Sequence, residues 1–460
     1  MTLKLKPPVP KEQLIIQNRE LVKMILPLVA EQFLIIFVGL VDTAMVSYLS
    51  EAAVSGVSLV DMINQLIIQV LAALATGGAV IASQYIGHKE QARACEAANQ
   101  LLLLIILIAL GIMALFLVFR RPFLKLLFGQ IEDDVMAEAL TYLKISAVSY
   151  PFIALYSGGT ALFRSMKKTN MTLILSLLMN VVNIVCNYIF MFVLGLGVAG
   201  AALGSLAGRG LAGIAAVLLL LNPVREVHLV HPKKQNSSFR LLDLQMAKRI
   251  LYIGIPNGLE NGMFQLGKIL VVSVISAFGT VQIAANAVAN NLDAFGVIPG
   301  FAFGLAMITI VGQSVGAGDY AQAEYFARKL NRMAGLVMFL YNVCLLILLP
   351  QLLNLYVLSD ETRQLASTLV TIHFIFSMFL WVPAFTKPNA LRAANDVKFT
   401  MTISIVSMWA FRVFFGIVLG KWMGMGVLGI WIAMLMDWAF RALMFALRFQ
   451  SKKWQRVKLI

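Results

Sequence analysis

The chain of 460 residues is 60% hydrophobic and only 13% charged, and its mean hydropathy is +0.85. Soluble globular proteins contain about 25% charged residues because their surfaces must be solvated. This composition therefore excludes the series of soluble domains that the length would suggest. The 37 Lys and Arg against 22 Asp and Glu leave a formal charge of +15. No basic patch is interleaved with aromatic residues, so the excess indicates basic loops facing a cytoplasm rather than a nucleic-acid partner.

Long apolar segments follow one another along the whole chain. A transmembrane helix needs about 20 largely apolar residues to cross roughly 30 Å of hydrocarbon. Twelve segments meet this condition, at residues 24–48, 57–86, 99–119, 137–162, 171–192, 199–221, 250–277, 283–311, 332–353, 365–385, 401–419 and 426–448. We therefore expect an all-α integral membrane protein with twelve transmembrane helices.

Basic residues are distributed unevenly between the predicted loops. With both termini in the cytoplasm, 28 of the 37 Lys and Arg fall on the cytoplasmic side and 5 in outer loops, which is a strong positive-inside bias. The cytoplasmic parts are then a lead at 1–23, a central linker at 222–249 and a basic tail at 449–460. This distribution predicts a multi-pass protein of the cell (plasma or inner) membrane.

The sequence repeats itself at a spacing of 229 residues. This offset aligns Pro27 with Pro256, and much later it aligns the glycines of 195–200 with those of 424–429. Six spans per repeat is an even number, so both repeats enter the membrane from the same side, an arrangement found in transporters. The two predicted lobes are residues 24–221 and 250–448.

Polar and ionisable side chains lie inside the first span. A carboxylate at mid-membrane costs about 2.5–3.5 kcal/mol, so such residues require a partner or a function. Glu31 and Asp42 are about three helical turns apart and share one face, and Pro27 can bend the helix before them. Asp42 has no obvious basic neighbour in sequence, and burial favours the protonated form of a carboxyl. We therefore predict that Asp42 carries a proton.

Amide-rich stripes at helical spacing occur in three further spans. Their members are Asp61, Asn64, Gln65 and Gln69; Asn180, Asn183 and Asn187; and Asn286, Asn290 and Asp293. Each stripe is one polar face, and such faces turn towards a bundle interior or a wet cavity. Together with Glu31 they are predicted to line a cavity, and hydrogen bonding between helices is the alternative.

The second lobe does not reproduce the acid of the first, because Asp42 aligns with Val271. The charged residues inside its spans are Glu260, Lys268, Asp293, Arg412 and Asp437. These three acids and two bases would either neutralise one another as a structural network or take part in transport. Glu260 and Asp293 are the second-lobe candidates for ion coupling.

The chain contains no catalytic motif. The GxGxxG pattern at 195–200 is reproduced at 424–429 and lacks the preceding strand that a nucleotide-binding turn requires. Both are therefore expected to be turns that lead into closely packed helices. The spans hold no HExxH motif, and the three cysteines form no CxxC pattern. We expect neither an enzyme nor a resident cofactor or metal site, and a monomeric chain.

Three segments resemble a known transporter family. They are PLVAEQFLIIFVGLVDTAMVSYLS at 27–50, GGAVIASQYIGHKEQARA at 77–94 and its second-lobe counterpart VGQSVGAGDYAQAEYFARKL at 311–330. They resemble bacterial members of the multidrug and toxic compound extrusion (MATE) family, and the resemblance covers nearly the whole chain. It implies a V-shaped bundle of two six-helix lobes that exports cationic, amphipathic compounds in exchange for protons or sodium ions.

The resemblance also implies roles for single residues. Asp42 falls on the first-lobe cation acid, Asn180 on the fifth-helix position that works with it, and Pro27 on the bend of the first helix. Glu260 falls on the second-lobe acid.

Two departures from the family pattern favour protons over sodium. An Asp that many members have on the fifth helix is replaced by Asn183 or Asn187, and the tenth span contains no Asp or Glu. Protons are therefore the expected coupling ion, and sodium at Asp42 or Glu260 is the alternative.

Two other classes of transporter fit the sequence less well. A flippase for lipid-linked saccharides, of related two-lobe architecture, would be expected to have a more cationic cavity and often fourteen spans. A major-facilitator transporter would have a basic loop signature that the loop at 87–93 lacks. We predict a secondary active multidrug exporter that works by alternating access.

Overall fold

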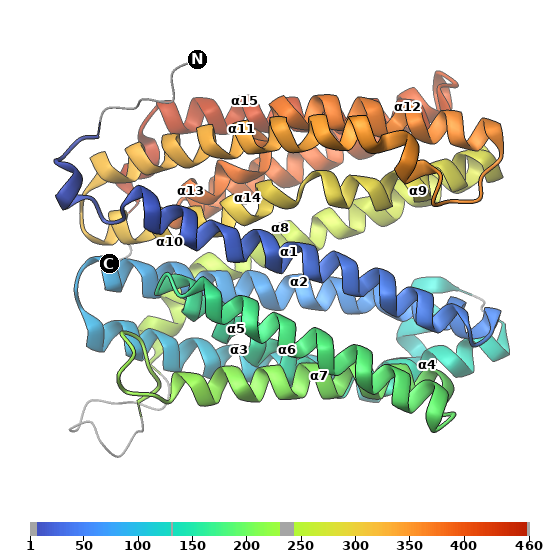
Figure 1. Cartoon of the computed structure of the whole chain (residues 1–460), viewed down its shortest axis with the longest axis horizontal. Helices are drawn as coiled ribbons and strands as arrows, with labels where there is room; N and C mark the ends of the chain where they lie inside the picture. Colours follow the sequence, from blue (N-terminus) through green and yellow to red (C-terminus); the bar gives the residue numbers. More distant parts are fainter. Residues whose placement is uncertain (1–6, 130–131, 231–242, 458–460) are drawn as a thin grey trace. The chain divides into compact units, whose positions relative to one another are not determined.

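The computed structural model describes residues 7–129, 132–230 and 243–457, and these ranges are helical with no strand (Figure 1). The predicted all-α fold is confirmed. The helices pack into two units. The first unit contains residues 26–258, and the second unit consists of the residues up to 25 together with those from 259 onward.

The elements follow one another with short connections. Up to the middle of the chain they are η1 (Lys11–Gln13), α1 (Asn18–Ser47), α2 (Glu51–Gly87), α3 (Gln91–Phe128), α4 (Asp133–Val148), α5 (Tyr150–Ser165), α6 (Thr169–Tyr188), η2 (Ile189–Val193), α7 (Gly197–Leu220) and α8 (Leu244–Ile275). They continue with η4 (Ser276–Phe278), α9 (Thr280–Gly296), α10 (Ile298–Gly316), α11 (Tyr320–Leu353), α12 (Asp360–Phe376), η5 (Ser377–Thr386), α13 (Pro388–Ala393), α14 (Val397–Ser407), η6 (Met408–Phe415), η7 (Val418–Trp422), α15 (Gly426–Gln450) and η8 (Lys453–Arg456).

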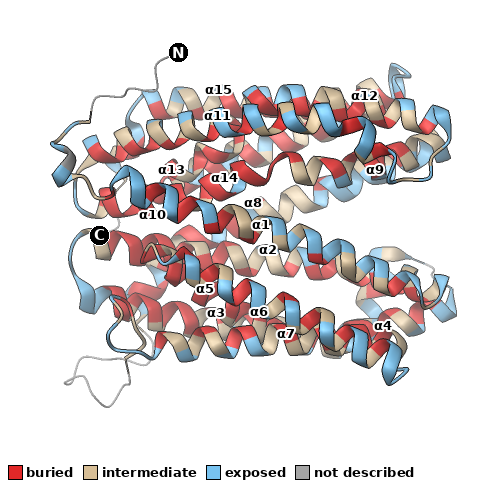
Figure 2. Cartoon of the chain, viewed as in Figure 1, coloured by how far each residue is buried: buried red, intermediate tan, exposed pale blue. Residues whose placement is uncertain are grey.

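Each unit packs around one largely buried helix. In the first unit α2 contacts α3, α4 and α5, and in the second unit α10 contacts α11, α13 and η5. Nearly every residue of α10 is buried (Figure 2). Small residues permit close approach of helices inside a membrane. At Gly56 of α2, for example, a Cβ would lie only 2.9 Å from the backbone nitrogen of Ala139 in α4.

Eleven helical segments of the described residues are long and apolar enough to cross a membrane. The sequence predicts one helix over 137–162, whereas the structure has α4 and α5, which meet at Ser149 just before Pro151. It also predicts one helix over 283–311, whereas α9 and α10 meet at Val297, before Pro299. Proline has no N–H to donate and its ring collides with the preceding turn, so both spans are interrupted there.

The two glycine patterns form equivalent turns. Gly195 and Gly197 have φ angles of +66° and +55°, and Gly424 and Gly426 have φ angles of +71° and +59°. Glycine adopts these left-handed conformations without steric penalty. The turns lead into α7 and α15, which is the structural role that the sequence predicts for them.

The ends of the predicted lobes differ from the structural units. Residues 231–242 of the predicted linker at 222–249, and 458–460 of the predicted tail, lie outside the described residues. The lead at 1–23, described from residue 7, packs with the second unit, where the backbone nitrogen of Ile15 donates to Gln322 Oε1 at 3.0 Å. The chain passes between the units within α1, after Ile25, and within α8, after Gly258.

Candidate functional site

Asp42 of α1 is held by amide groups of α6. Asn187 Nδ2 donates to Asp42 Oδ1 at 2.8 Å. The orientation of the Asn183 amide that satisfies its partners points the nitrogen at the same carboxylate, 2.9 Å from Oδ1 and 3.3 Å from Oδ2, and its oxygen then accepts from Ser205 Oγ at 3.1 Å. None of the ion pairs among the described residues includes Asp42. We call Asp42, Asn183, Asn187 and Ser205 the Asp42 cage.

Glycines of α7 bring that helix against α6 and position the cage. Gly200, Gly204 and Gly208 recur every four residues and therefore share one face. A Cβ at Gly208 would lie 2.6 Å from the Met179 carbonyl oxygen, and a Cβ at Gly204 would overlap the side-chain amide of Asn187. The absence of side chains on this face of α7 thus leaves the space that the Asn187 amide occupies.

A second polar group in the first unit surrounds Asp61 of α2. Asn64 Nδ2 and the Tyr142 hydroxyl donate to Asp61 Oδ1 at 3.2 and 3.3 Å. The Tyr150 hydroxyl in turn donates to Asn64 Oδ1 at 2.9 Å. The amide stripe of α2 predicts Asp61 and Asn64, but nothing in the sequence marks the two tyrosines, because they come from α4 and α5.

Arg209 of α7 links the two acidic groups electrostatically. It attracts both Asp42 and Asp61, which repel each other. Its Nη1 donates to Ser149 Oγ at 2.8 Å, at the break between α4 and α5. One base therefore faces two acids, so this group has an excess of negative charge when both carboxyls are ionised.

Repeat-related glutamates form buried ion pairs in both units. In the first unit Glu31 lies 3.5 Å from Arg164 Nη1 and accepts from Thr172 Oγ1 at 2.7 Å. In the second unit Glu260 Oε1 lies 2.6 Å from Arg392 Nη2. A buried carboxylate is stabilised by such pairing. Glu31 and Glu260 are therefore each paired with an arginine. The glutamates are related by the 229-residue offset, but the two arginines are not.

An acid and a histidine meet in the second unit. His373 Nε2 of α12 lies 2.6 Å from Asp293 Oδ1 of α9. The imidazole is fully buried, with ring centroids 5.8 Å from Trp431 and 5.1 Å from Trp438. Each residue stands out in its own span, but the two spans are far apart in sequence. Only the structure shows that the two side chains meet.

The remaining charges of the second unit differ in their pairing. Asp437 is completely buried, accepts from Arg441 Nε at 2.7 Å and accepts from the Ser407 hydroxyl. Lys268 and Arg412 form no ion pair with any described residue. Asp437 is therefore neutralised by Arg441, a residue that the sequence pattern does not mark, whereas Lys268 and Arg412 are attracted to Asp293 without forming a direct ion pair.

The structure separates some predicted residues from the cage. Asn180 donates to Ser176 Oγ of its own helix at 3.4 Å, so Asn183 and Asn187 are the asparagines that contact Asp42. Gln65 is exposed on α2. In the second unit Asn290 Nδ2 donates to the Asn286 carbonyl oxygen of its own helix at 2.8 Å. No cluster of three His, Cys, Asp or Glu side chains that would hold a metal ion occurs in the described ranges.

Two helical units with charged groups inside apolar spans define the chain as an integral membrane protein of repeat architecture. A family model confirms this, since MatE matches twice, over residues 27–189 and 256–418. The two matches are separated by 229 residues, the spacing of the predicted repeat. The chain belongs to the MatE family, the multidrug and toxic compound extrusion transporters; these are membrane transporters rather than enzymes.

Curated relatives match almost end to end. The probable multidrug resistance protein NorM of Thermotoga maritima is 26% identical over 458 residues, which is 97% of this chain and 95% of that protein. The uncharacterized transporter YisQ of Bacillus subtilis is also 26% identical, over 93% of both chains.

Solved structures share the fold at 18% identity. An outward-facing multidrug resistance MATE family transporter superimposes with a TM-score of 0.86, covering 94% of this chain and 96% of that one. A transporter of the MOP superfamily from Pyrococcus furiosus, described as having a binding pocket of reverse polarity, gives a TM-score of 0.85 over 94% of this chain and 95% of that one.

Proposed function

We propose that this transporter is a secondary active multidrug exporter that exchanges amphipathic compounds for protons through Asp42, by alternating access. Export of several drugs is supported by family membership and by relatives named as probable multidrug resistance proteins. The coupling ion rests on one observation, the Asp42 cage of neutral hydrogen-bond donors.

A proton suits this cage better than a sodium ion. Hard cations take oxygen ligands, whereas Asn187 directs its amide nitrogen at the carboxylate. Because no ion pair holds Asp42, a proton can bind without breaking one. Protonation turns one carboxylate oxygen into a donor and removes the negative charge, so the hydrogen bonds from the amides become weaker.

The same step would loosen α1 from α6. The cage is the side-chain link between these helices at Asp42, and Pro27 interrupts the hydrogen-bond ladder of α1 about four turns earlier. We therefore expect proton binding from the outside to bend α1 at Pro27 and to accompany release of the drug. Loss of the proton to the cytoplasm would restore the cage.

The charge of the group formed by Asp42, Asp61 and Arg209 supports the proposal that organic cations are one class of substrate. Asp42 and Asp61 face the single base Arg209, so a bound cation would compensate the excess negative charge. The positive-inside bias supports a protein of the cell membrane with both termini in the cytoplasm, and we propose that the monomer is the working unit.

Proteoliposomes test the coupling ion directly. Efflux of a fluorescent organic cation would be driven separately by an imposed pH gradient and an imposed sodium gradient. We expect the pH gradient alone to drive export, and Asp42→Asn to abolish it while substrate binding persists. Asp134→Asn, at an exposed acid in the first turn of α4, is the matched control and should export normally. Full pH-driven export by Asp42→Asn would overturn the assignment, as would export driven only by sodium.

A further inference from the structure

Two basic residues of the second unit, Lys268 and Arg412, form no ion pair among the described residues, although Asp293 attracts both of them. Arg412 of η6 is nine-tenths buried; its Nη2 donates to the Met434 sulfur at 3.1 Å, and its Nε has no hydrogen-bond partner. The guanidinium carbon lies 5.4 Å from the centre of the Phe264 ring. Lys268 of α8 makes no ion pair within the described ranges, and the two cations repel each other.

The acids of this region are already engaged. Asp437 is paired with Arg441, and Asp293 is paired with His373. With the imidazole neutral, three cations (Lys268, Arg412 and Arg441) face two carboxylates. An uncompensated charge inside a membrane segment is costly, so this part of the second unit would be stabilised by one additional anion.

Both cations line one small cavity. Its polar lining consists of Lys268 of α8, Asn286 and Asn290 of α9, and Arg412. Trp431 Nε1 donates to Asn286 Oδ1 at 3.0 Å, which leaves the amide nitrogen of Asn286 as a donor. The ammonium, the Arg412 Nε and this amide are all donors, which is the set that recognises a carboxylate or a phosphate.

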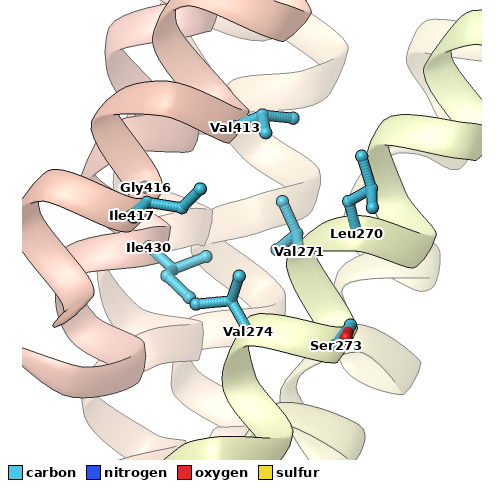
Figure 3. Close-up of a pocket in the computed structure, with 8 residues that line it drawn as sticks. All are labelled: Leu270, Val271, Ser273, Val274, Val413, Gly416, Ile417 and Ile430. Atoms are coloured by element: carbon cyan, nitrogen blue, oxygen red, sulfur yellow. The ribbon is translucent and has the colours of Figure 1, made fainter.

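An apolar pocket adjoins the cationic cavity. Val271 and Ile430 line both. In Figure 3 the pocket is bounded by α8 on one side, with Leu270 and Val274, and by the segment that includes Val413 on the other. Val271 follows Lys268 by three residues and Val413 directly follows Arg412, so each wall passes from a charged residue to apolar ones. The two spaces together place hydrogen-bond donors for an anionic group beside an apolar wall.

We propose that the second unit contains a binding site for an amphipathic organic anion, with its carboxylate or equivalent group at Lys268 and Arg412 and its apolar part between α8 and η6. The inference deepens the proposed transport function, on which it rests, because it adds anionic and zwitterionic compounds to the organic cations that the first unit favours. The occupant is a transported compound rather than a resident phospholipid.

A binding assay on the purified protein tests this site independently of transport. The probes are a fluorescent amphipathic carboxylic acid and its methyl ester, titrated into protein reconstituted in phosphatidylcholine nanodiscs. We expect the acid to bind at least tenfold more tightly than the ester, because a charge-assisted hydrogen bond contributes about 1.5–3 kcal/mol. Lys268→Met should remove this preference, and Lys268→Arg should retain it. Lys421→Met, at an exposed lysine of η7, is the matched control and should bind as wild type.

Three results would overturn the proposal. The acid and the ester could bind equally to wild-type protein, or Lys268→Met could keep the full preference for the acid. In nanodiscs that also contain phosphatidylglycerol, displacement of the acid by this lipid would make the site a lipid site. Because binding is measured without a gradient, failure of proton coupling at Asp42 would leave these outcomes unchanged. Arg412→Lys is a second variant. It keeps the charge of the buried residue and should therefore retain the preference for the acid over the ester.

Discussion

Asn187 and Asn180 lie on the same helix but have different partners, and this contrast gives a test of the Asp42 cage. Asn187 donates to Asp42 at 2.8 Å, whereas Asn180 donates to Ser176 of its own helix. A hydrogen bond to a charged group contributes about 1.5–3 kcal/mol. We expect Asn187→Ala to lower the initial rate of pH-driven export about tenfold or more, and Asn180→Ala to change it less than about twofold. Rates measured in proteoliposomes at equal protein density decide this, and the reverse order would show that Asn180 is the coupling partner.

The Glu260–Arg392 pair is expected to be structural. Its atoms are 2.6 Å apart and both side chains are largely buried. Removing one partner leaves an uncompensated charge, which typically costs about 3–5 kcal/mol, whereas replacing both is much less harmful. Arg392→Met should therefore lower the thermal unfolding temperature in detergent, and adding Glu260→Gln should recover most of the loss. Additive losses in the double variant would show that the two side chains are not coupled.

Residues within one span were more predictable than contacts between spans. Helical spacing alone predicts Asp42, the stripe from Asn183 to Asn187, and Asp293, because these side chains share a face or stand out against apolar neighbours. Their partners on other helices depend on packing, which periodicity does not report. The pairing of Asp293 with His373, and of Glu31 with Arg164, therefore required the structure.

At the scale of the helix, close packing of α7 on α6 should be as sensitive as the cage itself. A Cβ at Gly204 would overlap the Asn187 amide, whereas a Cβ at Gly210 of the same helix would meet nothing within 4 Å. We expect Gly204→Ala to impair pH-driven export and to lower the unfolding temperature. Gly210→Ala should leave both unchanged or raise the unfolding temperature slightly, because alanine favours helix over glycine by about 1 kcal/mol. Equal effects of the two substitutions would contradict this role of α7.

Helix positions followed from hydropathy, but their interruptions did not. Apolar length predicts each span because backbone groups in lipid must be paired within the helix. It does not show where a buried break is tolerated, and α4 with α5 and α9 with α10 are broken next to Pro151 and Pro299. Pro122 likewise follows a non-helical residue, Phe119, within α3, but Pro27 and Pro256 lie inside helices that continue past them. A proline alone therefore does not predict an interruption.

At the scale of the whole molecule, comparison of the two repeats shows which features the two units share and which they do not. The glutamates and glycine turns recur at 229 residues, and the matches to the family begin at Pro27 and Pro256. The ionisable site does not recur, since Val271 stands where Asp42 would be repeated and Asn183 is matched by Arg412. The group around Asp42 and Asp61 in the first unit therefore has more acids than bases, whereas Lys268 and Arg412 of the second unit form no ion pair among the described residues. The sequence shows these exchanges, but their meaning depends on which charges are paired, and only the structure reveals that.

The predicted orientation in the membrane follows from the excess of Lys and Arg in the loops on one side, and it can be measured. Replacing Cys95, Cys186 and Cys344 by Ala gives a background without thiols, and single cysteines are then placed at Val357 and Ser451. Val357 lies in the exposed connection between α11 and α12, and Ser451 follows α15. The positive-inside rule places basic connections in the cytoplasm. In intact cells a membrane-impermeant maleimide should therefore label Val357→Cys and spare Ser451→Cys, and in inverted vesicles the pattern should reverse. Two results would contradict this orientation: labelling of both sites only after permeabilisation, or labelling of Ser451→Cys in intact cells. Either result would also contradict the expected direction of proton movement through Asp42.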